Sequence, residues 1–294
     1  MDNKLQATVD IGSHSCILLI AAFEDAPASS PAETAEAEVK PRQILVPKLQ
    51  KVEICRLGED IYEHGAITPA RIEELSRVLT KFRMDLHALG ADLKAAVMTE
   101  AMRKASNPDE VLDAAEKALW MRPRIISGEE EGKLTYRSVK EWHGEGIVTI
   151  DIGGGSTELS NGETTFSIPV GALKMFKAMG PIPGPEYKKF VKETFKEVSF
   201  KGMTKKPVYL IGGTGTALAM VYLDKPKFDY KAIEGLEMSI ADLRDRIEIE
   251  KNNLDTMKLN HVISPLEDTS KIRKTRQDIA RMITILAEKE KQQN

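Results

Sequence analysis

The sequence is poor in cysteine, in net charge and in long apolar runs. With two cysteines, Cys16 and Cys55, the chain has neither a disulfide scaffold nor a cysteine-based zinc site. Both cysteines lie in strand-like runs, and we expect each to behave as a small buried apolar residue. The formal net charge of −3 gives no global field that would favour DNA as a partner. No apolar run approaches the roughly 20 residues that span a bilayer, and no signal pattern precedes the first strand-like run. We therefore expect a cytoplasmic protein with no membrane partner.

Apolar periodicity predicts mixed α/β domains. The 294 residues, 41% hydrophobic and 30% charged, are enough for two globular domains, each with its own core. Residues 5–23 have the apolar content of two strands, and residues 24–42 are expected to form a mobile hairpin tip. A helix capped by Thr68 is expected to end at Gly90. The second half repeats this order of strands followed by helices, which is typical of mixed α/β architecture.

A strand-like run that ends in Asp and a turn of glycine and hydroxyl residues occurs twice. Asp10-Ile11-Gly12-Ser13-His14-Ser15 returns 141 residues later as Asp151-Ile152-Gly153-Gly154-Gly155-Ser156-Thr157. Glycine lets several backbone N–H groups approach one anion, and hydroxyl groups add donors, so each turn is a predicted phosphate site. The Asp would repel phosphate and is expected to hold a cation or a water. The repeat predicts two related half-domains that face each other across one phosphate-binding cleft.

A third turn of this kind, residues 212–216, also follows a strand-like run. None of the three turns continues into Gly-Lys-Ser/Thr, which excludes a Walker loop, and Gly153 to Glu158 lacks the third glycine of the dinucleotide fingerprint. The five histidines are scattered, and no residues pair in the manner of a Ser-His-Asp triad. The remaining class of chemistry is phosphoryl transfer held by backbone amides, carboxylates and a metal.

These turns and several other blocks together resemble the exopolyphosphatase/guanosine pentaphosphatase (Ppx/GppA) family of the actin-like ATPase and sugar kinase superfamily. The matching blocks are Val9 to Ser13, Arg56-Leu57-Gly58, Thr99 to Asn107, Ile125 to Gly132, Asp151 to Leu159, and Gly212-Gly213-Thr214.

The resemblance implies an α/β fold of two ribonuclease-H-like (actin-like ATPase) domains with the active site in the cleft between them. We place the domains at residues 1–143 and 144–294, with the option that a C-terminal helix at 276–290 packs back on the first. The resemblance also implies that water hydrolyses a terminal phosphoanhydride, with Mg²⁺ or Mn²⁺ as cofactor.

The resemblance assigns roles by position in the matching blocks. Glu131 is implied as the general base, and Arg103 as a phosphate-contacting arginine. A carboxylate suits the role of base only if burial or an acidic neighbour raises its proton affinity, and Glu130 and Glu129 adjoin Glu131. Asp10, Asp151 and Glu158 are implied as the carboxylates that hold the divalent cation. Donors to the substrate phosphates are expected from Gly12, Ser13 and His14, from Gly153, Gly154, Gly155, Ser156 and Thr157, and from Gly212 and Gly213. Purely structural roles would be helix capping for Glu131, turn capping for the metal-site acids, and a solvated side chain for Arg103.

His14 departs from the family pattern, which usually has Asn at this position. Imidazole donates a hydrogen bond as an amide does, but it titrates near neutrality, so activity could depend on pH in an unusual way.

Several functions are compatible with these residues. The leading hypothesis is an exopolyphosphatase that removes terminal phosphate from polyphosphate. A phosphatase that converts guanosine pentaphosphate (pppGpp) to tetraphosphate would use the same chemistry with a base-binding pocket. A third hypothesis is a sensor that binds an alarmone or phosphate without turnover, and a fourth is a kinase of the wider superfamily. The resemblance makes a homodimer plausible.

Overall fold

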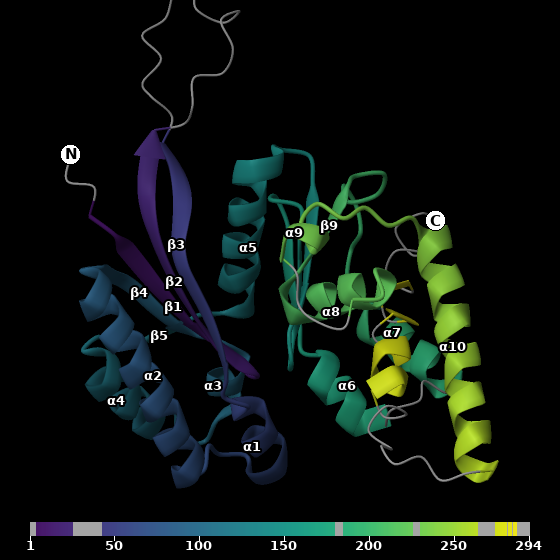
Figure 1. Ribbon diagram of the computed structural model, residues 1–294, viewed down its shortest axis with the longest axis horizontal. Coiled ribbons are helices and arrows are strands. Elements are labelled where there is room, and N and C mark those ends of the chain that lie inside the picture. Colours follow the sequence, from purple (N-terminus) through teal and green to yellow (C-terminus); the bar gives the residue numbers. More distant parts are fainter. Residues whose placement is uncertain are drawn as a thin grey trace, which may run out of the picture. The chain divides into compact units, whose positions relative to one another are not determined.

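The chain divides into two compact units. The structure is a computed structural model that describes residues 4–25, 43–179, 185–225, 230–263, 274–280, 282–283 and 285–286. By its contacts the first unit is Met1–Ser127 and the second is Gly128–Asn294. Each unit is described by itself (Figure 1). The domain boundary predicted between residues 143 and 144 stays a prediction.

The first unit is a five-stranded sheet with helices. Its strand order is β3-β2-β1-β4-β5, in which β1 pairs antiparallel with β2 and parallel with β4. The elements are β1 (Gln6–Ile11), β2 (Ser15–Asp25), β3 (Gln43–Ile54), α1 (Leu57–His64), α2 (Pro69–Leu89), β4 (Asp92–Met98), α3 (Glu100–Lys104), α4 (Pro108–Leu119) and β5 (Arg124–Ile125).

The hairpin and the helix that the sequence predicts in the first unit are confirmed. Strands β2 and β3 pair antiparallel up to Asp25 and Gln43, and the predicted tip between them lies almost wholly outside the described residues. The Thr68 hydroxyl accepts a hydrogen bond from the Arg71 N–H at the start of α2, and Gly90 ends the helix with a positive φ of 62°.

The core of the first unit lies on one face of its sheet. Ala7, Val9 and Ile11 alternate along β1 and are at most 2% exposed. They belong to the same buried cluster as apolar side chains of α2 and α4, among them Phe82 and Val111. Figure 1 shows these two helices side by side along the sheet. The alternate residues of β1, which include Asp10, therefore lie on the opposite face.

The second unit is built on a four-stranded sheet of order β8-β7-β6-β9. Its elements are α5 (Gly128–His143), β6 (Val148–Ile152), β7 (Thr157–Ser160), β8 (Thr165–Ile168), α6 (Ala172–Met179), α7 (Pro185–Thr194), β9 (Val208–Ile211), α8 (Gly212–Tyr222), α9 (Tyr230–Ile233) and α10 (Ile240–Ile263), with further helix at residues 274–280, 282–283 and 285–286.

The two sheets repeat one plan. In both, the first strand pairs antiparallel with the second and parallel with the fourth, and the second pairs with the third. Ile11 lies opposite Cys16 in the first unit, and Ile152 lies opposite Thr157 in the second. The equivalent residues are again 141 positions apart, so the structure confirms the internal repeat that the sequence predicts.

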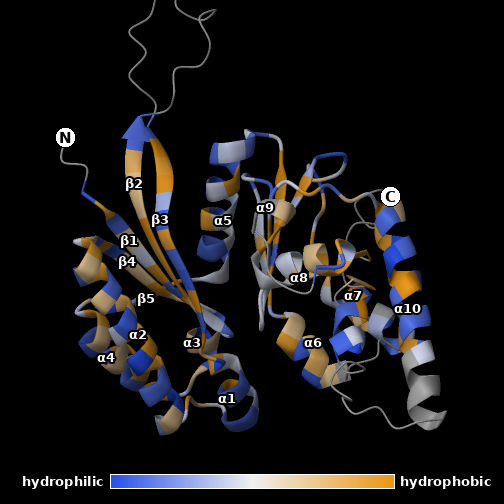
Figure 2. Cartoon of the chain, in the orientation of Figure 1, coloured by the Kyte–Doolittle hydropathy of each residue, from blue (hydrophilic) through white to orange (hydrophobic). Residues whose placement is uncertain are grey.

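Both faces of the second sheet are covered by helices of its own unit. On one face, β6 residues such as Ile150 share a buried cluster with α8, α10 and the last helical stretch. Hydrophilic residues dominate α10 (Figure 2), and its hydrophobic residues include the buried Leu243 and Ile247. Ile279 and Met282 belong to the same cluster, so this C-terminal stretch packs on the second sheet. The sequence also allows a packing of this stretch against the first domain.

Helix α5 covers the other face at close range because it presents two glycines to the sheet. A Cβ atom on Gly128 would overlap the side chain of Ser167, and one on Gly132 would lie 2.7 Å from the Thr165 methyl group. Both glycines also lie against Glu158 of β7. Residues four apart share one face of a helix, so this glycine pair sets the distance between α5 and the sheet.

Helix α6 supports the second turn from behind. The N–H group of Ala172 donates to the Gly153 carbonyl, and that of Leu173 donates to the Gly154 carbonyl, each over 2.9 Å. Gly171, just before the helix, leaves no room for a side chain. A Cβ there would lie 2.5 Å from the Gly153 oxygen and 2.6 Å from the Gly155 nitrogen.

No helix in the described parts of the chain is long and apolar enough to span a bilayer.

The tight contact at Gly171 predicts that Gly171→Ala destabilises the second unit, because the methyl group would meet backbone atoms that cannot move aside. We expect a loss of about 1–3 kcal/mol in the free energy of unfolding, measured by urea denaturation. Gly213→Ala is the matched control, since a Cβ at Gly213 meets nothing within 4 Å. Equal urea midpoints for the two variants would contradict this account of the contact.

Candidate active site

The second turn directs two backbone N–H groups away from α6. The carbonyl groups of Gly153 and Gly154 point at the helix, where they accept its first N–H groups. In a planar trans peptide the N–H group points opposite to the carbonyl, so the N–H groups of Gly154 and Gly155 point away from α6. Neither has an acceptor among the described residues. Successive outward N–H groups form a concave donor site for an anion, which is the chemistry predicted for this turn.

The hydroxyl residues of the second turn differ in their bonding. The Thr157 hydroxyl donates to the Val170 carbonyl over 2.6 Å, which fixes β7 to the segment leaving β8. The Ser156 hydroxyl has no protein partner in the part of the chain that the structure describes. Of the two hydroxyl groups, that of Ser156, a residue 4% exposed, is therefore the one that the described residues leave unbonded.

Two carboxylates lie next to each other across the sheet beside this turn. Asp151 of β6 pairs in register with Glu158 of β7, and Glu158 pairs in turn with Ser167 of β8. Directly paired residues present their side chains on the same face, here the face under α5. The Ser167 hydroxyl donates to Glu158 Oε1 over 2.8 Å, and Glu158 is 3% exposed.

Asp151 is crowded by the third turn. Gly212 has a φ of 76°, and a Cβ there would overlap Asp151 Oδ1, so the position requires glycine for two reasons. Burial raises the pKa of Asp151 to about 6. The Thr214 hydroxyl donates to the Ile152 carbonyl over 2.8 Å and fixes the third turn to the end of β6. Gly213 borders open space.

The carboxylates of the second unit fit part of a divalent-cation site. Asp151 and Glu158 supply hard oxygen ligands on one face, and Mg²⁺ is commonly held by one or two carboxylates together with waters and phosphate oxygens. Within the described residues, no group of three or more His, Cys, Asp or Glu side chains is arranged to hold a metal. The predicted metal site with Asp10 as a further ligand therefore stays a prediction.

The acidic residues expected near the reacting water lie in the first turn of α5. Glu130 and Glu131 are half-buried, and Glu129 is exposed. Glu131 directly precedes Gly132, which packs against Thr165 and Glu158 of the sheet. The predicted role of Glu131 as the general base stays a prediction.

The first turn has the same backbone arrangement with different side chains. Gly12 N–H donates to the Ser15 carbonyl over 2.9 Å, as Gly153 N–H does to Ser156 in the second turn. The Ser13 hydroxyl donates to Glu100 Oε2 over 2.9 Å and accepts from the Ala101 N–H. The Ser13 hydroxyl is therefore already bonded within the unit, and a phosphate at this turn would have to be bound by backbone groups.

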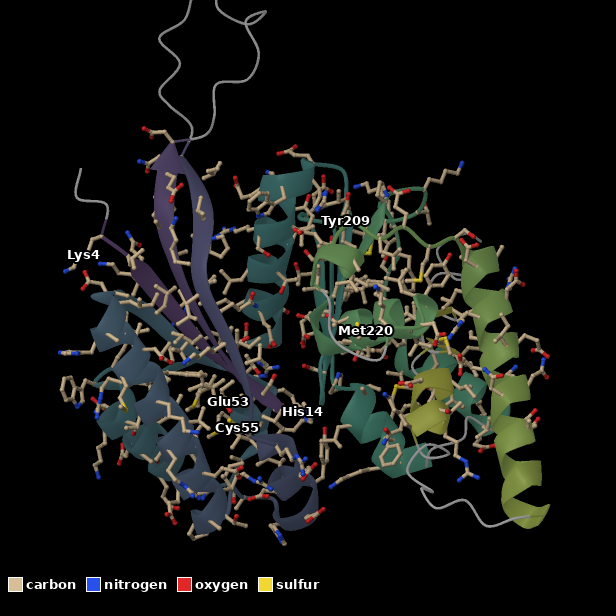
Figure 3. The ribbon with its side chains drawn as sticks, viewed as in Figure 1. Lys4, His14, Glu53, Cys55, Tyr209 and Met220 are labelled. Carbon is tan, nitrogen blue, oxygen red and sulfur yellow. The ribbon has the colours of Figure 1, made fainter. Side chains whose placement is uncertain are left out.

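His14 and Asp10 are exposed in the first unit. Figure 3 shows His14 at the end of the β2–β3 ribbon. Asp10 pairs in register with Ile17 of β2 and Val97 of β4, so no carboxylate lies beside it in those strands. The position of Glu158 in the second unit is taken by Ile17 in the first.

Arg103 bonds to the chain just ahead of α5. Its guanidinium Nη1 donates to the Ile126 carbonyl over 2.8 Å, which holds the segment from β5 toward Gly128. Its predicted contact with a substrate phosphate stays a prediction.

Sequence reasoning missed two residues that hold others in place. Glu100 is 4% exposed, holds Ser13 and forms an ion pair with Lys104. It lies within a matching block, which was the available signal. Ser167 holds Glu158, and no motif marks it, because its role depends on strand register.

Parts of the chain are similar in sequence to known proteins. The chain is 33% identical over 138 residues to exopolyphosphatase 1 of Mycobacterium leprae, which covers 44% of this chain and 41% of that protein. It is also 33% identical over 177 residues to the guanosine-5'-triphosphate,3'-diphosphate pyrophosphatase of Aeromonas hydrophila, covering 59% of this chain and 32% of that protein. The chain thus matches less than half the length of these relatives.

Solved structures support the fold. The Aquifex aeolicus PPX-GPPA enzyme has a TM-score of 0.72 and 24% identity, covering 98% of this chain and 92% of its own. An exopolyphosphatase from Cytophaga hutchinsonii has a TM-score of 0.68 and 19% identity, covering 99% and 91%. The similarity to these structures, together with the two mixed sheets of this chain, confirms the expected α/β fold of two ribonuclease-H-like domains, and the cleft between them stays a prediction.

A family model extends across most of the chain. The model of the Ppx/GppA phosphatase family matches residues 37–285, which include the second and third turns, Glu131 and both carboxylates of the second sheet. The agreement of this match with the two sheets and their Asp-Gly turns leads to one conclusion: the chain belongs to the Ppx/GppA phosphatase family.

Proposed function

We propose that this protein is an exopolyphosphatase, a hydrolase that removes the terminal phosphate of inorganic polyphosphate. The observation that carries the proposal is the juxtaposition in one unit of an outward N–H pair, at Gly154 and Gly155, with the carboxylates of Asp151 and Glu158. Backbone N–H groups bind phosphate, and carboxylate oxygens bind divalent cations, so the two together suit a polyphosphate substrate that carries a divalent cation. The relative from M. leprae carries the same activity in its name.

In the proposed reaction a water oxygen attacks the terminal phosphorus and the bond to the bridging oxygen breaks. Glu131, a half-buried carboxylate in the first turn of α5, accepts the proton of that water. The N–H groups of Gly154 and Gly155 stabilise the charge on the phosphate oxygens. A bound Mg²⁺ or Mn²⁺ would neutralise charge on the substrate, with Asp151 and Glu158 as its protein ligands.

The second candidate is a pppGpp 5'-phosphohydrolase. It is favoured by the A. hydrophila relative, whose match covers more of this chain than that of the M. leprae protein. The chemistry at the terminal phosphate would be the same, so the residues assigned above would keep their roles. The two candidates differ in their need for a site that recognises guanine.

If Glu131 is the general base, the variant Glu131→Gln should lose most of the rate of phosphate release. Phosphate release from medium-chain polyphosphate and from pppGpp should be measured with Mg²⁺ for the wild type and the variant. We expect the variant to lose about 10²- to 10⁴-fold in kcat, the usual contribution of a general base. Glu129→Gln is the matched control, because Glu129 is the exposed acid in the same helical turn.

Each result of this experiment decides between hypotheses. Faster release from polyphosphate supports the exopolyphosphatase, and faster release from pppGpp supports the second candidate. Full activity of Glu131→Gln would show that the base is another group. Release from neither substrate by the wild type would contradict both hydrolases and leave a sensor that binds without turnover. Transfer of phosphate to ADP instead of water would indicate a kinase.

The raised pKa of Asp151 predicts how stability and activity depend on pH. The carboxylate is charged above about pH 6 and becomes protonated as the pH falls through that value, so activity should fall there if Asp151 holds the cation. Its folded pKa lies above the ordinary 3.8, so the folded protein loses stability as the pH rises from about 4 to 6. Asp151→Asn should remove this loss.

Thermal unfolding checks the prediction without an activity assay. In chelator at mildly alkaline pH, Asp151→Asn should melt above the wild type, and the difference should shrink as the pH is lowered through about 6. Adding Mg²⁺ should raise the melting temperature of the wild type and leave that of Asp151→Asn unchanged. Equal stabilisation of both proteins by Mg²⁺ would exclude Asp151 as a ligand.

A further inference from the structure

The two cysteines of the chain, 39 positions apart, meet inside the first unit. Cys16 Sγ and Cys55 Sγ lie 2.8 Å apart, and both residues are 0% exposed. A disulfide requires a separation of about 2.05 Å, so a shift of less than one ångström would join the two sulfur atoms. The sequence predicts buried cysteines, and the structure adds that they are neighbours.

The thiol pair lies directly behind the first turn. Cys16 follows Ser15 at the start of β2, and Cys55 follows the last residue of β3. The N–H groups of Cys55 and Arg56 both donate to the His14 carbonyl, each over 2.9 Å. Figure 3 shows Glu53, Cys55 and His14 close together at this end of the ribbon. Any change at the thiols therefore acts on the backbone that shapes the turn.

The second unit shows what this position does in the repeat. Cys16 is equivalent to Thr157, and Cys55, two residues past the strand partner of Cys16, is equivalent to Val170. Thr157 donates a hydrogen bond to the Val170 carbonyl there. In both units a side-chain contact thus joins the start of the second strand (β2 or β7) to the segment that follows the third strand (β3 or β8). In the first unit the groups at this junction are two thiols.

We propose that Cys16 and Cys55 are an oxidative modification site, at which hydrogen peroxide converts the two thiols into a disulfide that locks the first Asp-Gly turn. One thiolate attacks the peroxide, the O–O bond breaks, and a sulfenic acid forms with loss of water or hydroxide. The second thiol attacks that sulfur, the S–S bond forms, and the S–O bond breaks with loss of a second water. Two thiols are oxidised by two electrons, and the peroxide is reduced to two waters.

The environment selects the first thiol to react. The hydrogen bond from Cys16 lowers the pKa of the Cys55 thiol, whereas the same bond and burial raise the pKa of Cys16. Thiolate is the nucleophile, so Cys55 becomes the sulfenic acid and Cys16 resolves it. This assignment does not depend on the proposed hydrolase activity.

Thiol trapping tests the proposal on the full chain. The protein is exposed to hydrogen peroxide, quenched, unfolded and alkylated, and then analysed by intact mass and by a peptide map without reductant. Because the chain has two cysteines, the expected result is a loss of both alkylatable thiols within one molecule and their recovery after dithiothreitol. Peptides containing Cys16 and Cys55 should be found joined.

Two variants and one further measurement make the test decisive. Cys16→Thr copies Thr157 and Cys55→Val copies Val170, so each replaces a thiol with the side chain that the repeat accepts. Neither variant should form an intramolecular disulfide. In the oxidised wild type, the N–H groups of Cys55 and Arg56 should exchange with deuterium more slowly than in the reduced protein, and peroxide should not slow them in Cys16→Thr.

Other results would overturn the proposal. Two thiols that stay alkylatable at peroxide concentrations that oxidise the unfolded chain would show that the site does not react. Disulfides between molecules, or a sulfinic acid at either residue, would show that the pair does not close. A disulfide with unchanged exchange at Cys55 and Arg56 would contradict the locking of the turn.

Discussion

The planar trans peptide is the constraint on which the candidate site depends. A turn cannot aim its N–H groups at a ligand unless its carbonyl groups are held in the opposite direction. At the second turn, α6 provides this restraint, because its first N–H groups bind the carbonyls of Gly153 and Gly154. Gly171 makes the restraint possible, since any side chain there would push the helix off the turn. The anion site is thus formed jointly by a turn and by the helix that lies behind it.

The first unit meets the same constraint with α1. Gly58 N–H binds the Ser13 carbonyl, and the N–H groups before α1 bind that of His14. The two units share this backbone scheme but carry different chemistry at equivalent positions. Ile17 stands where the second unit has Glu158, and Ser13 is bonded to the buried Glu100. The two units therefore share the turn, whereas the second carboxylate is found in one of them.

Much of this arrangement could be predicted from local sequence. Strand-like runs, the Thr68 cap, the Gly90 stop and the repeated Asp-Gly phrase each depend on residues that are neighbours in the chain, so their physical signals survive without tertiary contacts. The resemblance of the blocks then predicted the family and the fold. Helix α6 was not predicted, although its own sequence is strongly amphipathic, and its bonds to the turn are visible only in the structure.

The sequence by itself determined the α/β class, the internal repeat and the family, because these rest on residue types at fixed spacing. Only the tertiary structure decided which groups hold which. Ser167 bonds Glu158 through strand register, and Gly128 and Gly132 bring α5 onto that carboxylate. Cys16 meets Cys55 because the hairpin returns the chain to its start. Such contacts join residues far apart in sequence, and their pairing depends on register, twist and packing distance, which no single segment encodes.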